Sequence, residues 1–147
     1  MPASDLLLRL LLAAGLGAAV GIERELRGKP AGLRTNILIA LGAALFTTVS
    51  MEMTRLSGTP DRITAQVVTG IGFLGAGTIL RTRGNVHGMT TAATIWVNAA
   101  IGVAVGSGEY AMGIVAAVVT LVVLAVLGPI EAYFDRRAGV EKDQRAD

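Results

Sequence analysis

The chain has 147 residues, of which 52% are hydrophobic and only 16% charged, and its mean hydropathy is +0.61. Soluble domains carry about 25% charged residues, so this composition favours a single-domain membrane protein. The chain has no cysteine, one histidine and a net charge of +2. These numbers exclude disulfides and thiol catalysis, argue against a histidine metal cluster, and leave too little charge for nucleic-acid binding.

Five apolar runs are long enough to form helices. They cover residues 6–22, 37–51, 63–80, 89–105 and 110–130. The shortest membrane spans have about 17 residues, and the second run reaches that length only if its helix begins near residue 33. A soluble helix bundle is the alternative, but five consecutive runs with so little charge would leave it no polar face. We therefore expect an all-α membrane protein with a bundle of about five transmembrane helices.

The basic residues between the runs predict the topology. Ten of the 13 Lys and Arg residues would lie on one side of the membrane: Arg24, Arg27, Lys29, Arg34, Arg81, Arg83, Arg136, Arg137, Lys142 and Arg145. Cytoplasmic segments carry the excess of positive charge, so we expect the N-terminus outside and the C-terminus in the cytoplasm. Residues 1–135 would form the transmembrane domain, and residues 136–147 a short charged cytoplasmic tail.

The first run combines a charged pair with a small-residue face. Asp5 and Arg9 have the i,i+4 spacing of a helical ion pair near the outer surface. Ala13, Gly17 and Gly21 follow at spacings of four, which is the pattern of a close helix–helix contact.

Charged residues gather at the cytoplasmic end of this run. Glu23 and Glu25 alternate with Arg24 and Arg27, and Arg34 follows after a Gly- and Pro-containing turn. One interpretation is a solvated collar of local ion pairs. The other is a cytoplasmic-side site in which Glu23 binds a cation or pairs with Arg34. Mg²⁺ often keeps its waters, so one or two carboxylates can suffice to hold it.

The third run contains Gly70, Gly72, Gly75 and Gly77. On a helix Gly70 and Gly77 lie within about 20° of each other, while Gly72 and Gly75 point to another side. We expect a helix packed between two partners, in which Ala at Gly72 or Gly77 is mild and Leu lowers the amount of folded protein. Residues 70–75 (GIGFLG) also match the G-x-G-x-x-G pattern of dinucleotide-binding proteins. However, no turn precedes them and no acidic residue follows about 20 residues later. We reject that interpretation.

The fourth run places Thr91, Thr94, Asn98 and Gly102 on one helix face, within about 80°. Asn98 lies near mid-span, where a polar group usually contacts protein. We expect it to hydrogen-bond against the glycine-rich third run; a place in a solute path is the alternative. Trp96 is also mid-span, which indicates a packing residue and not an interfacial anchor.

Three stretches together resemble the MgtC/SapB family of bacterial inner-membrane proteins. They are GIERE (21–25) with KPAGLRT (29–35), GIGFLGAG (70–77), and GMTTAA (88–93) followed by Trp96 and AIG (100–102). The resemblance covers residues 4 to about 135 and implies a multi-span module in the inner membrane. Well-known members also carry a C-terminal cytoplasmic domain resembling an ACT fold, and this chain stops before one.

What the resemblance implies about function is a link to Mg²⁺ homeostasis, growth at low Mg²⁺, intracellular survival of pathogens and restraint of the F-type ATP synthase. Two hypotheses follow: a regulatory module that packs against another membrane protein, or a Mg²⁺ transporter or channel. A cation path would ordinarily contain an intramembrane carboxylate, and the sequence has none between residues 63 and 105. We favour regulation, with the lipid bilayer, a second copy and another inner-membrane protein as partners. We expect no enzyme activity, because no catalytic constellation is visible, and no cofactor.

Overall fold

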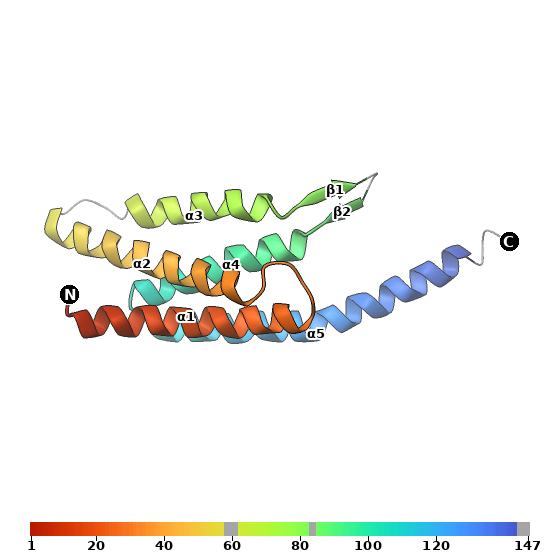
Figure 1. The fold of residues 1–147 in the computed structure, drawn as a ribbon, viewed down its shortest axis with the longest axis horizontal. Helices are drawn as coiled ribbons and strands as arrows, with labels where there is room; N and C mark the ends of the chain where they lie inside the picture. Colours follow the sequence, from red (N-terminus) through yellow and green to blue (C-terminus); the bar gives the residue numbers. More distant parts are fainter. Residues whose placement is uncertain (58–61, 83–84, 144–147) are drawn as a thin grey trace.

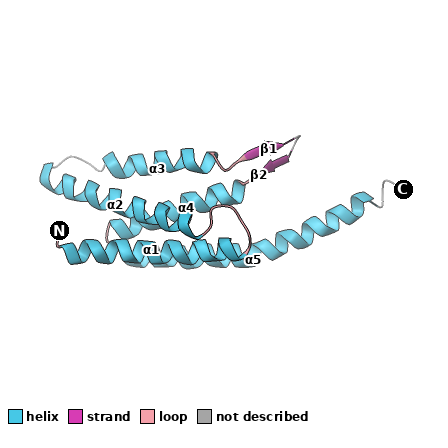
Figure 2. Ribbon diagram, in the orientation of Figure 1, coloured by secondary structure: helices cyan, strands magenta, loops and turns pink. Residues whose placement is uncertain are grey.

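The computed structural model describes residues 1–57, 62–82 and 85–143 and shows an elongated bundle of helices (Figures 1 and 2). In chain order its elements are α1 (Ala3–Leu26), α2 (Leu33–Ser57), α3 (Arg62–Ala76), β1 (Leu80–Thr82), β2 (Asn85–His87), α4 (Met89–Gly106) and α5 (Tyr110–Asp143). Apart from the short β-hairpin and the turns that connect the elements, the described chain is helical. The predicted all-α membrane fold is confirmed, because four of these helices are long and apolar enough to cross a membrane.

Helix α3 is shorter than the sequence predicts. The expected helix ran to residue 80, but α3 has 15 residues and ends at Ala76. Its last turn tightens because the Thr78 N–H and hydroxyl both donate to the Gly75 carbonyl, at 3.0 and 2.7 Å. At 1.5 Å per residue α3 is roughly 22 Å long, against about 30 Å for the bilayer core. The chain leaves α3 into the antiparallel hairpin, in which Leu80 pairs with His87.

The helices alternate in direction, so the connections sort to two ends of the bundle (Figure 1). The N-terminus and the α4–α5 turn share one end, while the α1–α2 loop and the β-hairpin lie at the other. This arrangement is compatible with the charge asymmetry in the sequence. Arg83 and Arg145, which contributed to that asymmetry, lie outside the described residues, and the orientation across the membrane stays a prediction.

The core consists of small residues that let the helices approach closely. Ala13, Ala40, Ala44 and Val105 form one buried cluster where α1, α2 and α4 meet. A Cβ added at Gly17 would lie 2.7 Å from the Asn36 carbonyl oxygen, well inside ordinary contact. Gly21, Gly102 and Gly106 likewise face the backbone of α2. The small-residue face predicted for the first run is confirmed, and it packs against α2, which also contacts α3 and α4.

Helix α5 has 34 residues and extends past the bundle (Figure 1). Its membrane-length segment is Tyr110–Gly128, and the side chains along it are largely exposed and apolar. The helix continues through residue 136 to Asp143, so no break in secondary structure marks the expected boundary at 135. The division into a membrane domain and a tail stays a prediction.

Candidate functional site

Asn98 joins α4 to α2 inside the bundle. Its side chain is fully buried, and its Nδ2 donates to the Asn36 carbonyl at 2.6 Å and to the Asn36 Oδ1 at 3.1 Å. Asn36 in turn donates to the carbonyls of Ala31 and Gly32, which closes the α1–α2 loop. The expectation that Asn98 faces the glycine-rich helix is wrong, because the close contacts of Gly102, one turn further along α4, bring this face against α2 instead. The Asn98 Oδ1 has no hydrogen-bond partner among the described residues.

Arg24 and Thr91, singled out in different parts of the sequence, meet in the structure. The Arg24 Nη2 donates to the Thr91 Oγ1 at 2.7 Å and approaches the Pro30 carbonyl at 3.4 Å. Arg24 is only 4% exposed and Thr91 is 3% exposed, so this is a buried contact of a charged group with a hydroxyl. It ties the end of α1 to the first turn of α4. No spacing pattern could predict this contact, because 67 positions separate the two residues.

The carboxylates beside Arg24 each have a local partner. Glu23 pairs with Arg27 at 2.6 Å, so the predicted pair of Glu23 with Arg34 is wrong: the i,i+4 partner on the same helix is nearer. Glu25 accepts the N–H of Leu33 at 3.0 Å and so holds the first turn of α2. The described residues contain no group of three or more His, Asp or Glu side chains that could hold a metal. Cation binding by Glu23 stays a prediction.

Arg27 also reaches α5, a contact that the sequence analysis missed. Its Nη2 donates to the Ala125 carbonyl at 3.1 Å. In a regular helix that carbonyl would accept the N–H of residue 129, but residue 129 is proline and has no N–H. The guanidinium of α1 therefore satisfies an acceptor that Pro129 leaves free. Pro129 within an apolar run was the signal that could have revealed it.

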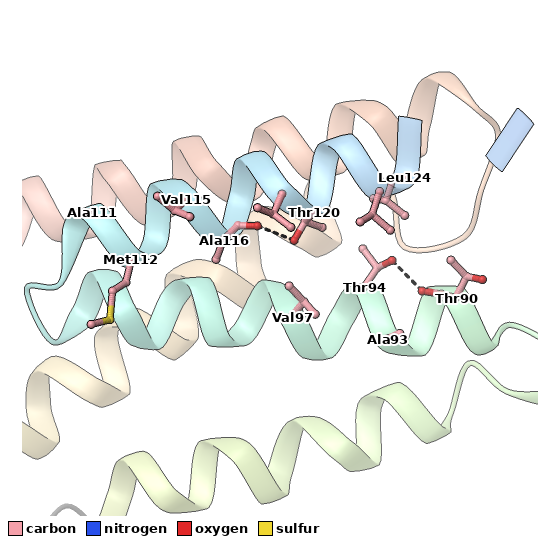
Figure 3. A pocket seen from close by; sticks show the side chains of 12 residues that line it. Thr90, Ala93, Thr94, Val97, Ala111, Met112, Val115, Ala116, Thr120 and Leu124 are labelled. Atoms are coloured by element: carbon pink, nitrogen blue, oxygen red, sulfur yellow. Dashed lines mark hydrogen bonds between the residues drawn. The ribbon is translucent and has the colours of Figure 1, made fainter. Parts of the chain in front are cut away.

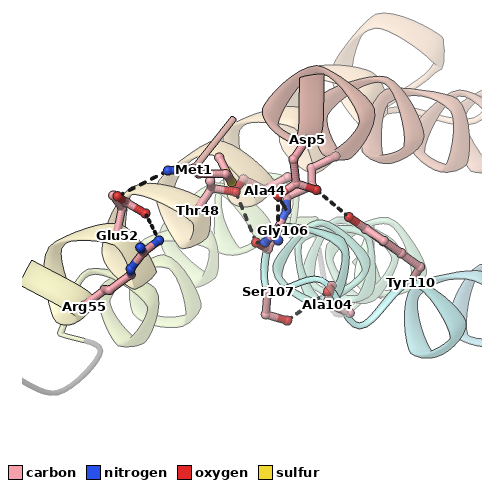
Figure 4. A network of polar contacts seen from close by, with 11 residues as sticks. Met1, Asp5, Ala44, Thr48, Glu52, Arg55, Ala104, Gly106, Ser107 and Tyr110 are labelled. Carbon is pink, nitrogen blue, oxygen red and sulfur yellow. Dashed lines mark hydrogen bonds and ion pairs between the residues drawn. The ribbon is translucent and has the colours of Figure 1, made fainter. Parts of the chain in front are cut away.

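At the other end of the bundle a polar network converges on the last carbonyl of α4 (Figure 4). The Gly106 carbonyl accepts from the Arg9 Nη1 at 2.5 Å and from the Thr48 Oγ1 at 3.1 Å. The predicted Asp5–Arg9 ion pair is confirmed at 3.0 Å, and the Tyr110 hydroxyl donates to Asp5 at 3.2 Å. Cations at a helix C-terminus are stabilising, so α1 caps α4 and anchors the start of α5.

The four glycines of α3 and its end have little contact within the chain. A Cβ at Gly70 or Gly72 would meet no other atom within 4 Å. One at Gly75 would touch the Ala92 carbonyl of α4 at 3.4 Å, and one at Gly77 would approach the Phe73 and Leu74 carbonyls of the preceding turn and no other helix. Within this chain α3 therefore packs on one side, and Leu at Gly72 would not overpack it.

The outer face of α3 carries a stripe of small, exposed residues, which we call the α3 stripe. It consists of Ala65, Thr69, Gly72 and Ala76, and these lie within about 60° around the helix. The Thr69 hydroxyl points back to the Ala65 carbonyl at 3.4 Å, so the stripe presents little polar surface. Trp96 on α4 is also half exposed, which places the one tryptophan on the bundle surface and not in its core.

Two grooves run along the bundle. One, of about 790 Å³, lies between α4 and α5 (Figure 3). Its hydroxyls Thr94 and Thr120 donate to the helix carbonyls of Thr90 and Ala116, both at 2.7 Å, so its wall is apolar. The other, of about 870 Å³, lies between α2, α3 and α4 and includes Arg34.

These features define a class: a multi-pass helical membrane protein with a core of small residues and buried polar contacts between its helices. The model of the MgtC family matches residues 10–133, and the chain belongs to this family. The family resemblance read from the sequence is thereby confirmed.

Curated relatives give the same family. The chain is 51% identical over 130 residues to the putative magnesium transporter YhiD of Escherichia coli K12, covering 84% of this chain and 60% of that protein. It is 50% identical over 115 residues to protein MgtC of Salmonella typhimurium, covering 78% and 49%. It is 43% identical over 134 residues to the uncharacterized protein slr0014 of Synechocystis, covering 91% and 57%. The chain thus spans about half to three-fifths of these relatives, and no solved structure matches it.

Proposed function

We propose that this chain is a regulatory module of the bacterial inner membrane, linked to Mg²⁺ homeostasis, that acts by docking against other membrane helices. The observation that carries this proposal is the exposed α3 stripe, with Gly72 at its centre. Small residues let helix backbones approach closely in lipid, where packing and not the hydrophobic effect drives association. A stripe of this kind on the outside of a bundle is suited to an intermolecular contact.

The polar groups inside the bundle support the same function. Asn98, Arg24 and Arg9 each donate to a neighbouring helix or loop. These side chains join α1, α2 and α4 into one unit, and α3 packs against α2 and α4 of that unit. Buried contacts of this kind favour a fixed bundle that presents the α3 stripe over a moving path.

The partners follow from the stripe and the family. A second copy is the simplest partner, because the same stripe on two chains can form a symmetric dimer. The resemblance implies the F-type ATP synthase as a second partner, and low Mg²⁺ or intracellular survival as the condition in which the module acts. The name of the Escherichia coli relative, a putative magnesium transporter, supports the link to magnesium.

Mg²⁺ transport is the second candidate function. One observation favours it: the Asn98 Oδ1 and the Thr47 Oγ1 are buried oxygens without a hydrogen-bond partner among the described residues. Neutral oxygens of this kind could join a hydrated path for a hard cation. The name of the Escherichia coli relative points the same way.

One matched pair of variants tests the docking proposal. Gly72→Leu changes the α3 stripe, whereas Gly15→Leu makes the same change at an exposed glycine of α1 whose added Cβ also meets open space. We expect both proteins to accumulate normally, and Gly72→Leu alone to lose crosslinking to a second copy and growth at low Mg²⁺. Equal behaviour of the two variants would refute docking through the stripe. Wild-type Mg²⁺ flux in proteoliposomes that Asn98→Leu abolishes would favour transport.

A further inference from the structure

The groove between α2, α3 and α4 lies on a different face of α3 from the stripe. Its walls are apolar and include Leu38, Phe46, Val67, Gly70 and Leu74. Leu38 is 67% exposed and Phe46 is 56% exposed, so the chain itself leaves these side chains uncovered. In a bilayer this surface must be filled by lipid or by protein.

Two glycines give the groove its width. Gly42 on α2 and Gly70 on α3 both line it, and an added Cβ at either would meet no atom within 4 Å. The missing side chains therefore serve no contact between helices of this chain. They leave room for something slender to lie between α2 and α3.

One end of the groove is positively charged. Arg34 and Thr35, in the first turns of α2, line this end together with Thr78 after α3. Arg34 is exposed and makes no ion pair or hydrogen bond within the described chain. The nearby carboxylates are engaged, Glu23 with Arg27 and Glu25 with the Leu33 N–H. An unpaired guanidinium at the end of an apolar groove suits a ligand whose anionic group binds Arg34 and whose apolar part lies in the groove.

The length of the groove fits one leaflet. From Thr35 to Phe46 the wall of α2 rises roughly 17 Å, close to half of the bilayer core of about 30 Å. We propose that this groove holds one acyl chain of an anionic phospholipid, with its phosphate at Arg34. Arginine forms bidentate hydrogen bonds with phosphate, and basic pockets between membrane helices bind anionic headgroups.

A second copy fits this groove less well. A docked chain of parallel orientation would have to present a carboxylate at the level of Arg34. Among the acids whose side chains the structure describes, Glu23 and Glu25 are engaged, and Asp5, Glu52 and Glu109 lie near the N-terminal end of α1 and the α4–α5 turn, away from Arg34. The α4–α5 groove provides an internal comparison, because no charged side chain lines it and it offers nothing to select a headgroup.

The test measures which lipid the purified chain retains. The protein is placed in nanodiscs that contain both phosphatidylglycerol and phosphatidylcholine. It is then extracted in mild detergent, and native mass spectrometry identifies the lipid that stays bound. We expect the wild type to retain one phosphatidylglycerol. Arg34→Gln should reduce this retention about five-fold, and Arg34→Lys should keep most of it. Arg55→Gln is the matched control, because Arg55 lies at the far end of the same helix with only a long contact to Glu52.

A second variant separates the chain site from the headgroup site. Gly70→Leu fills the groove and should remove retained lipid of either headgroup without changing the folded yield. Equal retention of the two lipids by the wild type, or an unchanged Arg34→Gln, would overturn the proposal. So would a Gly70→Leu protein that loses dimer crosslinks but keeps its lipid, because a second copy would then occupy the groove. This experiment measures lipid retention. If the lipid proposal fails, the docking test at Gly72 is unaffected.

Discussion

The close contact of α1 with α2 gives a sharp prediction at Gly17. An added Cβ there would lie 2.7 Å from the Asn36 carbonyl oxygen and 2.9 Å from the Ala40 Cβ, where ordinary contacts begin near 3.4 Å. The obstacle is backbone and a Cβ, neither of which can rotate away. Gly17→Ala must therefore move α1 and α2 apart by several tenths of an ångström.

The magnitude is measured against Gly15→Ala in the same helix. Both changes gain about 1 kcal/mol of helix propensity, so this term cancels in the difference between them. Gly15 has no atom within 4 Å of an added Cβ, so only Gly17→Ala carries the overpacking cost of about 1–3 kcal/mol. For a chain of this size that corresponds to a melting temperature lower by about 3–10 °C.

The assay is thermal unfolding of the two purified variants in one detergent, followed by loss of the monodisperse peak in size-exclusion chromatography. Wild-type protein and Gly42→Ala serve as further references, since Gly42 is also open. If Gly17→Ala and Gly15→Ala have the same melting temperature, α1 and α2 do not approach each other as closely at Gly17 as the structure shows.

Three further predictions concern the polar contacts and the topology. Arg27→Ala should lower the free energy of unfolding by about 1 kcal/mol. The loss should be smaller in a Pro129→Ala background, because alanine restores an N–H that can donate to the Ala125 carbonyl. Equal losses in the two backgrounds, measured by urea unfolding, would refute this coupling. Asn98→Ala should cost about 0.6–1.7 kcal/mol through its lost bonds to Asn36, and a variant as stable as the wild type in the same assay would contradict this role. A reporter inserted after Gly108 should be periplasmic and one at the C-terminal end cytoplasmic; the opposite pattern would invert the predicted orientation.

Sequence periodicity could predict the helices because the bilayer imposes long apolar runs on any span. Four membrane-length helices, the Asp5–Arg9 pair and the small-residue face around Gly17 all follow from such local spacing. The end of α3 at Ala76 did not follow, because the apolar run continues to residue 80 while the backbone turns into a hairpin.

Contacts between distant residues were the part that spacing could not supply. Arg24 with Thr91, and Asn98 with Asn36, depend on which helix lies beside which. The sequence indicated that α3 and α4 are neighbours, and they are, but it could not show that the polar face of α4 turns towards α2. A periodic pattern defines a face and leaves its partner undetermined.

Helix α3 is the element whose sequence makes least sense within one chain. Gly70 and Gly72 lower its helix propensity by about 2 kcal/mol together, and in this chain neither of them permits a close contact with another helix. For Gly17 and Gly21 in α1, and for Gly102 and Gly106 in α4, that cost is offset by the packing of α2 against them. For α3 we propose that the compensation comes from outside the chain: a helix against the α3 stripe, and a lipid chain in the groove beside Gly70. The prediction at Gly72 and the prediction at Arg34 test these two contacts separately. Both faces stay open because only α2 and α4 pack against α3 within the described chain. A helix of roughly 22 Å, attached to the bundle on one side, leaves the surrounding membrane components to complete its packing.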